Sequence, residues 1–480
     1  MNDSKRLASL LQAYQNWAIV GGQWGDEAKG KITDLLAPFF DYVDRYSGGS
    51  NAGHTTYVPA GKIVGHLIPS GLAQGKTCII SRGVFFDLSA FLTELSEAGK
   101  VLGKLPPIFI DEGCTVRTPW HNYLELWSER ARGSKWANTT NRGIGPMASI
   151  RAARLDIKLA DLYGGKEALL EKLELLRRIY LPIFENMKTA GIISRIETAE
   201  EVGLGLASEA AQIKDYVLDT RRLLLDGMRK GQRILFEGAQ AALLDATWGT
   251  WPYTSSGDAI AGGVFTETGL PPSPLGVAMV VKILPTRVGE GPMPSEIWNR
   301  AEAEQYAKDH EELFKAGWER SEFLSALLSK INSKQTSPAE ISQYFQVLGD
   351  ERGSTTGRGR SVGFIDVPII QYAAEINGPQ FLALTKLDTL SGLRSIKVAV
   401  AYEFEGRRLQ SGELPSANRL HEASVIWEEW PCWTADIRSC RDFNDLPAEA
   451  KALVLKLEGL VGIPIRLISN EPSREAIIVR

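Results

Sequence analysis

The sequence is poor in the residues that mark several common protein classes. Its 480 residues contain four cysteines (Cys78, Cys114, Cys432 and Cys440), with neither a CxxC pair nor a nearby group of histidines. This scatter argues against a structural zinc site or a disulfide framework and favours a reducing compartment. No apolar run approaches membrane-spanning length, and the charged N-terminus lacks a signal-peptide core. We therefore expect a soluble, cytoplasmic protein.

Charge and length narrow the class further. The net charge is only −4 and no basic run stands out, which argues against a nucleic-acid-binding surface. The length allows one large domain or about three ordinary ones. We find neither an internal repeat nor a low-complexity linker in the chain.

Short apolar runs, many of them next to glycines, alternate with helical patterns. This alternation is typical of the α/β class, in which a mostly parallel sheet is covered by helices. The expected strands include 77–80, 108–110, 234–236, 277–281 and 381–384.

Two long helical stretches interrupt the alternation. The first runs from about 159 to 230, and its predicted apolar stripe consists of Leu169, Leu170, Leu173, Leu176 and Ile179. The second runs from about 294 to 350 and is rich in charge, so we expect a helical insertion. A solvated surface explains such a stretch better than a catalytic role.

The segment 21–32 carries more chemical information than any other part of the chain. It lies between an apolar run and residues at helical spacing, which predicts a strand, a glycine-rich turn and a helix start. Backbone N–H groups and the positive helix end then face a phosphate. The spacing from Gly25 to Lys31 fits the GxxxxGK pattern, but Ile32 stands where a magnesium-binding hydroxyl is usual. Asp26 is the nearest alternative oxygen ligand. Taken alone, the pattern also fits an ordinary glycine-rich turn.

Two further glycine-rich turns combine polar groups. His54 lies in the turn 48–55, where it could donate a proton to a phosphate bridge oxygen or simply cap the turn. The turn 139–146, followed by Arg151 and Arg154, offers the hydroxyls and guanidinium groups that suit a monophosphate. Surface arginines are common, so Arg151 has an ordinary explanation as well.

Four more segments have suitable chemistry but little specificity. The segment 236–240 ends in Gln240, and 249–256 is rich in hydroxyls; each, taken alone, is explained by a surface turn. The loop 354–360 carries two arginines that suit a dicarboxylate, or else it is a solvated basic loop. Asp388, after the run 381–384, could accept both the ring imino and the exocyclic amino hydrogens of guanine.

Taken together and in this order, the segments resemble adenylosuccinate synthetase. The resemblance runs from Trp17 to Arg480 and includes 286–292 and 363–366, which makes coincidence negligible. It implies one domain over 1–480 with a P-loop-like GTP-binding ligase fold, in which helices flank a large, mostly parallel central sheet. It also implies a GTP-dependent ligase of purine nucleotide biosynthesis. Such an enzyme phosphorylates the 6-oxo group of inosine monophosphate (IMP) and then joins L-aspartate, giving adenylosuccinate, GDP and phosphate.

The resemblance implies catalytic roles at matching positions. Asp26 would take the ring imino proton of IMP and, with the Gly53 carbonyl, hold one Mg²⁺ per subunit. His54 would neutralise charge on the departing GDP. Lys29 and the loop amides would stabilise the transferred phosphoryl group, and Gln240 would support the 6-position.

The implied binding residues fall into three groups. The GTP group is Gly25, Asp26, Glu27, Ala28, Lys29, Gly30, Lys31, Gly53, His54, Thr55, Arg360, Lys386, Leu387, Asp388, Ser469, Asn470 and Glu471. The IMP group is Asn51, Ala52, Thr140, Arg154, Gln240, Ser255 and Arg358. The aspartate group is Ser354, Thr355, Thr356, Gly357, Arg358 and Arg360. Arg154 would reach the substrate of the other subunit, so the resemblance implies a homodimer with shared sites. Its other partners would be small molecules, without nucleic acid or membrane.

The chain departs from the family pattern at several positions. Ala28 adds a methyl group in the phosphate loop, and Asn141 and Ala241 also replace glycines. Ser255 replaces a threonine. The segment 469–472 reads Ser-Asn-Glu-Pro, where the family usually has Thr-Gly between serine and proline, which adds a carboxylate beside the guanine pocket.

Three hypotheses for the function therefore compete. The first is a working adenylosuccinate synthetase, and the second is a paralogous ligase that uses another purine monophosphate, another amino acid or ATP. A family branch that aminates guanylate-type substrates loses the loop aspartate, so Asp26 argues against that branch. The third is a nucleotide-binding regulator without turnover. The retained pair Asp26 and His54 argues against it, because binding alone needs no proton-transfer pair.

Overall fold

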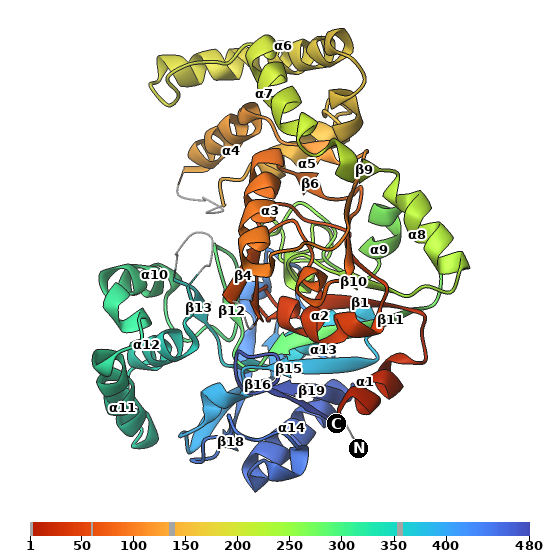
Figure 1. The fold of residues 1–480 in the computed structure, drawn as a ribbon. Helices are drawn as coiled ribbons and strands as arrows, with labels where there is room; N and C mark the ends of the chain where they lie inside the picture. Colours follow the sequence, from red (N-terminus) through yellow and green to blue (C-terminus); the bar gives the residue numbers. More distant parts are fainter. Residues whose placement is uncertain (1–2, 59–60, 134–139, 353–358) are drawn as a thin grey trace.

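A ten-stranded sheet forms the centre of the molecule (Figure 1). The computed structural model describes residues 3–58, 61–133, 140–352 and 359–480. The strand order is β20-β19-β15-β11-β1-β10-β2-β5-β7-β9, and every neighbouring pair is parallel except β19 and β20. The strands are β1 (Asn16–Gly21), β2 (Tyr42–Arg45), β5 (Thr77–Ile80), β7 (Ile108–Asp111), β9 (Val217–Leu218), β10 (Ile234–Glu237), β11 (Leu275–Lys282), β15 (Phe381–Thr385), β19 (Ile465–Ser469) and β20 (Ile477–Val479). The predicted mostly parallel sheet is confirmed.

Helices cover both faces of this sheet, which explains why its strands appear as continuous apolar runs. Trp17 and Ile19 of β1 pack in one core cluster with α1 (Asp3–Leu11) and α2 (Lys29–Leu36). Ala18 and Val20, on the opposite face, share a larger cluster with α13 (Val367–Asn377). All five runs predicted as strands belong to this sheet.

The first predicted helical stretch begins as a cap at the top of Figure 1, and its last helix lies on the right side. It contains α6 (Lys166–Thr189), α7 (Ala199–Ala211) and α8 (Thr220–Arg229), but it also contributes the edge strand β9, which we did not predict. Leu169, Leu173 and Leu176 are buried as expected, whereas the side chain of Ile179 is 45% exposed. The prediction for Ile179 was wrong because, at 100° per residue, it lies off the stripe that Tyr180 continues.

The second stretch forms α10 (Arg300–Asp309), α11 (Trp318–Asn332) and α12 (Pro338–Gly349), which project from the left side of Figure 1. We call residues 300–349 the helical arm. Trp318 on α11 is 72% exposed, in agreement with a solvated surface. The surface interpretation is wrong for α12, because Tyr344 and Phe345 are buried in the main core.

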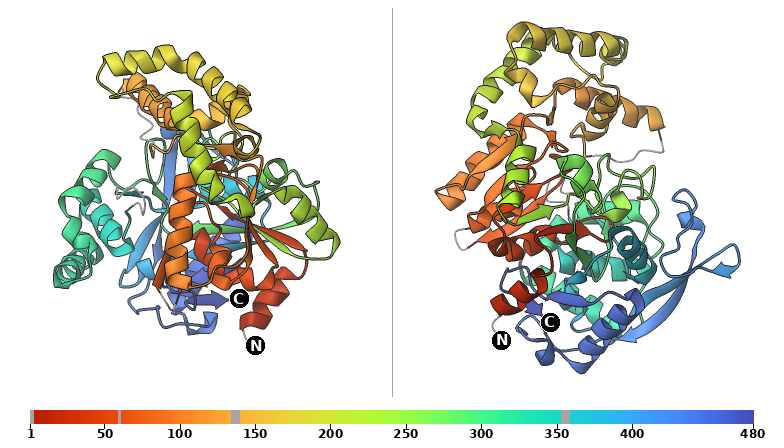
Figure 2. Two further views of the ribbon diagram at one scale, coloured as in Figure 1. Left: turned by 45° about the horizontal axis from the view of Figure 1, so that its top comes forward. Right: turned by 90° about the vertical axis from the view of Figure 1, so that its right-hand side faces the viewer.

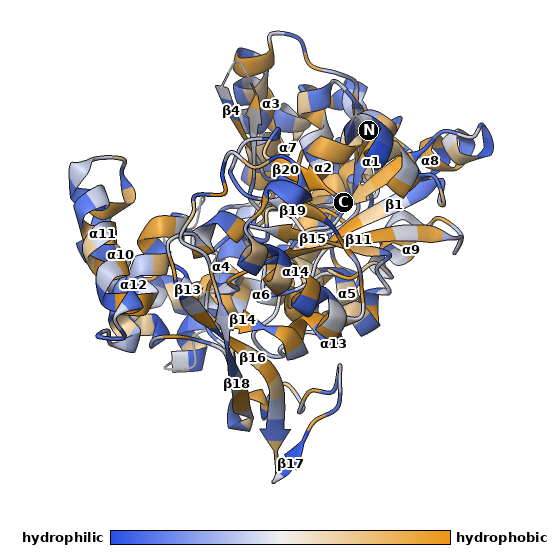
Figure 3. Cartoon of the chain, turned by 90° about the horizontal axis from the view of Figure 1, so that it is seen from below, coloured by the Kyte–Doolittle hydropathy of each residue, from blue (hydrophilic) through white to orange (hydrophobic). Residues whose placement is uncertain are grey.

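A smaller sheet, formed by β14, β16, β17 and β18, extends away from the main one (Figure 2, right view). The tip of this sheet at β17 is hydrophilic, whereas the strands of the main sheet are hydrophobic (Figure 3). The remaining elements are α3 (Leu88–Leu102), α4 (Pro119–Arg132), α5 (Ile144–Ala152), α9 (Gly263–Thr268), α14 (Ala448–Val461), β3 (His54–Val58), β4 (Gly61–Gly65), β6 (Phe85–Phe86), β8 (Thr115–Val116), β12 (Thr286–Arg287), β13 (Ser361–Val362), β14 (Ile365–Asp366), β16 (Ser395–Phe404), β17 (Arg407–Arg408) and β18 (Ser424–Pro431). In the part of the chain that the structure describes, every helix is too short or too polar to cross a bilayer.

Candidate active site

The carboxyl ends of six adjacent strands, β19, β15, β11, β1, β10 and β2, meet at one edge of the main sheet. The phosphate loop follows β1, Gln240 follows β10, and the turn that leads to His54 follows β2. Asp388 follows β15, and Ser469 ends β19. Ligands of open α/β sheets bind outside the carboxyl ends of the strands, so the fold brings the predicted segments to the expected edge.

The side chain of Glu27 holds the backbone of the phosphate loop from the protein interior. Its carboxylate is fully buried and accepts hydrogen bonds from the backbone N–H groups of Gln23 (3.2 Å) and Gly25 (2.8 Å). It also pairs with the Lys29 ammonium at 2.8 Å. Glu27 was predicted to contact GTP, but its side chain faces inward, so only its backbone is available to a nucleotide. Lys29 lies beside the loop with its charge balanced by Glu27.

Two residues of the loop adopt a left-handed backbone. Asp26 has φ 60° and Ala28 has φ 68°, a region that costs a residue with a Cβ roughly 1–2 kcal/mol. The conformation turns the Asp26 side chain outward, where it is 35% exposed and forms an ion pair with Arg360 Nε at 2.7 Å. The predicted base therefore contacts a residue predicted to bind aspartate.

Lys31 departs from its expected role. Its ammonium donates hydrogen bonds to Ser469 Oγ at 2.7 Å and to the Glu471 carbonyl at 2.6 Å. Burial lowers the pKa of Lys31 to about 8. The GxxxxGK pattern predicts a lysine directed at phosphate, whereas Lys31, the third residue of α2, extends towards β19 and ties the phosphate loop to the predicted guanine segment.

The other predicted guanine residues are buried or half-buried. Burial raises the pKa of Asp388 to about 6. Leu387 is fully buried, and the buried Asn470 amide donates to the carbonyls of Ile437 (2.6 Å) and Cys440 (3.0 Å). The carboxylate of Glu471, which we noted as an addition to this pocket, lies 3.5 Å from Arg441, so its charge is partly balanced.

His54 occupies a buried cage of charged groups. Its Nδ1 contacts the Glu237 carboxylate, and its Nε2 lies 3.0 Å from the Arg45 guanidinium. Arginine can only donate, so Nε2 accepts and Nδ1 carries the proton. Burial and the charge of Arg45 lower the pKa of His54, which keeps the imidazole neutral. Both ring nitrogens have protein partners, so His54 must leave one of them to act on a nucleotide.

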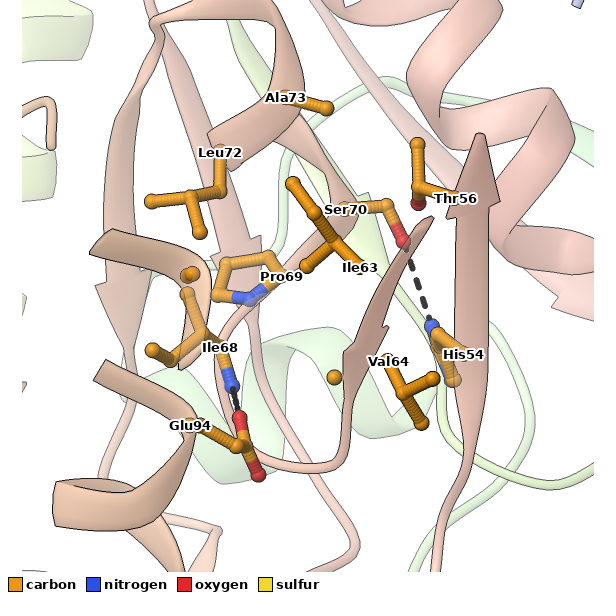
Figure 4. Close-up of a pocket in the computed structure, with 12 residues that line it drawn as sticks. His54, Thr56, Ile63, Val64, Ile68, Pro69, Ser70, Leu72, Ala73 and Glu94 are labelled. Atoms are coloured by element: carbon orange, nitrogen blue, oxygen red, sulfur yellow. Dashed lines mark hydrogen bonds between the residues drawn. The ribbon is translucent and has the colours of Figure 1, made fainter. Parts of the chain in front are cut away.

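The cage borders the phosphate loop on one side and a small cavity on the other. A Cβ added to Gly30 would meet His54 Cβ at 3.2 Å, which places the histidine against the start of α2. Behind it, the small cavity is lined mostly by apolar side chains such as Ile63 and Leu72 (Figure 4). Glu94 closes its far end by accepting the Ile68 N–H at 3.0 Å. Few polar atoms face this cavity, so it does not suit a nucleotide.

Three residues of the predicted IMP group have buried polar atoms without a hydrogen-bond partner among the described residues: Asn51 Oδ1, Gln240 Nε2 and Ser255 Oγ. Gly48 lies close to the two segments that carry Gln240 and Ser255. A Cβ added to Gly48 would lie 3.3 Å from Gln240 Oε1, and one added to Gly257 would lie 3.8 Å from the Gly48 nitrogen. Buried polar atoms are nearly always paired, so these three have the capacity to bind a polar ligand.

The turn that carries Thr140 lies near this set and is anchored from α4. Asn122 donates to the Asn141 carbonyl at 2.9 Å, and Asn141 has φ 55°, which explains why glycine is usual at that position. The turn leads into α5, where a Cβ added to Gly145 would lie 3.6 Å from Ser256 Oγ. Arg154, just beyond α5, is exposed on its own subunit.

The buried carboxylate of Glu351 connects Lys386, which is predicted to bind GTP, with Arg360, which is predicted to bind aspartate. It lies 3.2 Å from Lys282 Nζ, 2.5 Å from Lys386 Nζ and 3.2 Å from the Arg360 guanidinium. Burial alone would raise the pKa of Glu351, but these three cations hold it well below its usual value. Lys386, which the resemblance places in the GTP group, points to Glu351 and donates to the Gly349 carbonyl at 2.8 Å.

Five predicted site residues lie outside the described residues: Ser354, Thr355, Thr356, Gly357 and Arg358.

The sequence analysis missed four charged residues of the site, namely Arg45, Glu237, Lys282 and Glu351. Arg45, Glu237 and Lys282 each end a buried strand, and a charge there needs a partner or a ligand, so this position was an available signal.

A phosphate loop at the centre of a parallel sheet, with a carboxylate turned towards the ligand side, defines an α/β enzyme that uses a nucleotide. The sequence profile described as adenylosuccinate synthetase matches residues 18–478. The chain therefore belongs to the adenylosuccinate synthetase family, whose members are ligases that form a C–N bond.

Individual relatives agree with this assignment. The adenylosuccinate synthetase of Mycobacterium tuberculosis (strain ATCC 25618 / H37Rv) is 38% identical over 471 residues, which cover 96% of this chain and 97% of the relative. That of Geotalea daltonii is 36% identical, with 97% and 98% covered. The structure of the fully ligated enzyme from Plasmodium falciparum superposes with a TM-score of 0.81 at 29% identity, covering 97% of this chain and 100% of that one. A cyanophage S-2L succinoaminodeoxyadenylate synthetase, 14% identical with a TM-score of 0.53, shares the fold alone; 97% and 95% of the two chains are covered.

Proposed function

We propose that the protein joins L-aspartate to IMP with GTP as phosphoryl donor, giving adenylosuccinate, GDP and phosphate in purine nucleotide biosynthesis. The observation that carries this proposal is the contact between Asp26 and Arg360. A proton-accepting carboxylate within a phosphate loop has a use in catalysis that it lacks in binding. An arginine beside it suits a substrate with carboxylates.

The chemistry proceeds in two steps. Asp26 removes the ring imino proton of IMP, and the 6-oxygen then attacks the γ-phosphoryl group of GTP. Phosphate is a better leaving group than oxide, so the amine of aspartate displaces it from carbon 6. For aspartate to bind, Arg360 exchanges part of its contact with Asp26 for a carboxylate of the substrate, while Glu351 keeps it in place.

The remaining predicted residues bind and orient the substrates. Asn51, Gln240 and Ser255 offer their unpaired buried atoms to IMP, and Thr140 adds a hydroxyl. The loop amides, fixed by Glu27, and Lys29 stabilise the transferred phosphoryl group. The predicted aspartate group 354–358 completes the aspartate site, and Arg358 serves both substrates. Ala52, for IMP, and Thr55, for GTP, belong to the turn that carries His54.

The site suits a magnesium ion held jointly by protein and substrate. Among the described residues, no group of three histidine, cysteine or acidic side chains could hold a metal by itself. Mg²⁺ in phosphoryl-transfer sites commonly uses one or two carboxylates together with substrate phosphates and water. Asp26, which is partly exposed, and the carbonyl of Gly53, an exposed residue, would hold it, and when bound it would neutralise phosphate charge.

The assembly and its location follow from the same proposal. We infer a homodimer in which Arg154 reaches the IMP of the partner subunit, because on its own subunit it is exposed. We also infer a cytoplasmic enzyme, in agreement with four cysteines that are all free thiols.

A paralogous ligase is the second candidate, and Glu471 is the observation that favours it. A carboxylate next to the guanine pocket changes the electrostatics of nucleotide choice. Turnover measured with GTP or ATP against inosine, guanosine and deoxyguanosine monophosphates, with aspartate and its analogues, separates the two candidates. Preference for GTP, IMP and aspartate supports the first, and any other preferred set supports the second.

The proposed base is tested by Asp26→Asn, which keeps the size of the side chain and removes its basicity. We expect turnover to fall by at least about a thousandfold, because no other carboxylate lies in the loop facing the ligand. Binding of GTP and IMP, measured by calorimetry, should stay within about tenfold of the parent. Turnover equal to that of the parent enzyme would remove Asp26 from the mechanism.

A further inference from the structure

The helical arm adjoins both residues that flank the segment 353–358. Arg352 and Gly359 form an antiparallel bridge with each other. The Arg352 guanidinium lies 2.9 Å from Glu311 and stacks over the Phe314 ring at 5.2 Å, and both of these partners belong to the arm. The arm therefore anchors Arg352, the N-terminal flank of the segment 353–358 that precedes Gly359 and Arg360.

Gly359 packs directly against α10. A Cβ added at this position would lie 2.6 Å from Ala307 Cβ and 3.3 Å from the Ala303 carbonyl oxygen. Contacts below 3.0 Å require something to move, so the backbone at Gly359 is as close to α10 as a glycine allows. This close approach fixes the distance between the helical arm and the C-terminal flank.

Gln346 of α12 holds the backbone of Arg360. Its side-chain amide is fully buried and donates to the Arg360 carbonyl at 2.8 Å and to the Ala303 carbonyl at 3.3 Å. The Arg360 N–H donates to the Glu351 carbonyl at 2.9 Å. Glu351, the second residue after α12, also pairs with the Arg360 side chain. Both peptide groups of Arg360 are thus tied to the arm or to its C-terminal continuation.

We propose that the helical arm is the element that positions Arg360, with Gln346 as its positioning residue, and that it thereby sets the affinity for the amino-acid substrate. The inference rests on the proposed function, in which Arg360 binds a carboxylate of aspartate. Gln346 touches no reacting atom. It acts by fixing the backbone from which the guanidinium reaches Asp26.

The first test compares Gln346→Met with Gln343→Met. Both changes preserve side-chain length on the same helix. Gln343 is only half-buried and, within the described part of the chain, makes no hydrogen bond to Arg360 or Ala303. Loss of the amide donors should raise KM for aspartate about 3- to 10-fold, the range expected for a hydrogen bond. KM for IMP and kcat should change less than about twofold. Gln343→Met should leave all of these values unchanged.

The second test uses the contact between Gly359 and α10. Gly359→Ala should raise KM for aspartate by at least about fivefold, because its Cβ would collide with Ala307. Adding Ala307→Gly removes that collision and should recover part of the loss, whereas Ala307→Gly alone should change thermal stability without changing KM for aspartate selectively. A purely structural role would lower stability without this selective effect and recovery.

Arg360→Leu separates failure of the inference from failure of the proposed function. If Arg360→Leu raises KM for aspartate but Gln346→Met does not, the positioning role is overturned and the proposed function stands. If Arg360→Leu leaves KM for aspartate unchanged, Arg360 does not bind this substrate, and the inference falls with that part of the proposed function. If both variants raise it selectively, the inference is supported.

Discussion

At the smallest scale, single polar atoms carry the proposed IMP site. Ser255 Oγ is buried without a partner among the described residues, so its hydroxyl is desolvated in the protein without compensation. Ser255→Ala should therefore leave the free energy of unfolding within about 0.5 kcal/mol of the parent, or raise it slightly. The same change should raise KM for IMP about fivefold, because IMP loses the hydrogen bond that the Ser255 hydroxyl would donate. Calorimetric unfolding and initial rates measure the two effects.

Ser342→Ala is the matched control for this prediction. Ser342 on α12 is also buried with an unpaired hydroxyl among the described residues, but it lies outside the predicted IMP group. Its replacement should be equally neutral for stability and leave KM for IMP unchanged. Equal effects of the two substitutions on KM would contradict the assignment of Ser255 to the IMP site.

The protonation of Asp388 should control guanine recognition. Burial raises its pKa to about 6, and only the ionised carboxylate can accept both guanine hydrogens. An acid is ionised above its pKa, so affinity for GDP should hold above pH 6 and fall about fivefold from pH 6 to pH 5. Titration calorimetry with GDP measures this directly. Asp388→Asn should bind weakly with no such step, and an unchanged step in that variant would assign the titration to another group.

At the scale of an element, the phosphate loop contains a strained residue that the sequence analysis had marked as a departure. Ala28 has φ 68°, which glycine adopts freely. Ala28→Gly should raise the free energy of unfolding by up to about 1 kcal/mol, because relief of strain outweighs the extra entropy of the unfolded glycine. Differential scanning calorimetry measures the shift.

Gly30, two residues on, gives the opposite expectation. Its φ is not left-handed, and an added Cβ would lie 3.0 Å from Ser70 Oγ and 3.2 Å from His54 Cβ. Gly30→Ala should therefore lower the unfolding temperature and turnover together. Stabilisation by Gly30→Ala, or destabilisation by Ala28→Gly, would contradict this description of the loop.

At the scale of the whole molecule, Arg154 points to an assembly. It follows α5 with a left-handed backbone (φ 63°) and is exposed on its own subunit. If it completes the partner's site, a dimer of Asp26→Asn and Arg154→Leu subunits contains one site with neither change. Mixing the two inactive variants should restore up to about a quarter of the parent activity by random exchange. Activity that stays at zero while native mass spectrometry shows mixed dimers would rule out sharing.

Local sequence patterns predicted the elements well, because they depend on neighbours in the chain. The runs 234–236 and 381–384 are buried on both faces, and this burial by itself favours apolar residues throughout. The position of the phosphate loop follows equally from glycines after an apolar run. Ile179 and β9 show the limit of such predictions. A single residue next to a helical stripe and an edge strand of two residues both leave almost no periodic signal.

The partners of the charged residues were decided only by the tertiary structure. Lys31 bonds to Ser469, 438 positions away, because β1 and β19 end at the same edge of one sheet. His54 meets Glu237, and Asp26 meets Arg360, for the same kind of reason. The amino-acid order determined the family chemistry through its motifs. The order of the strands, which comes from long crossover connections and has no local signature, decided which charge faces which.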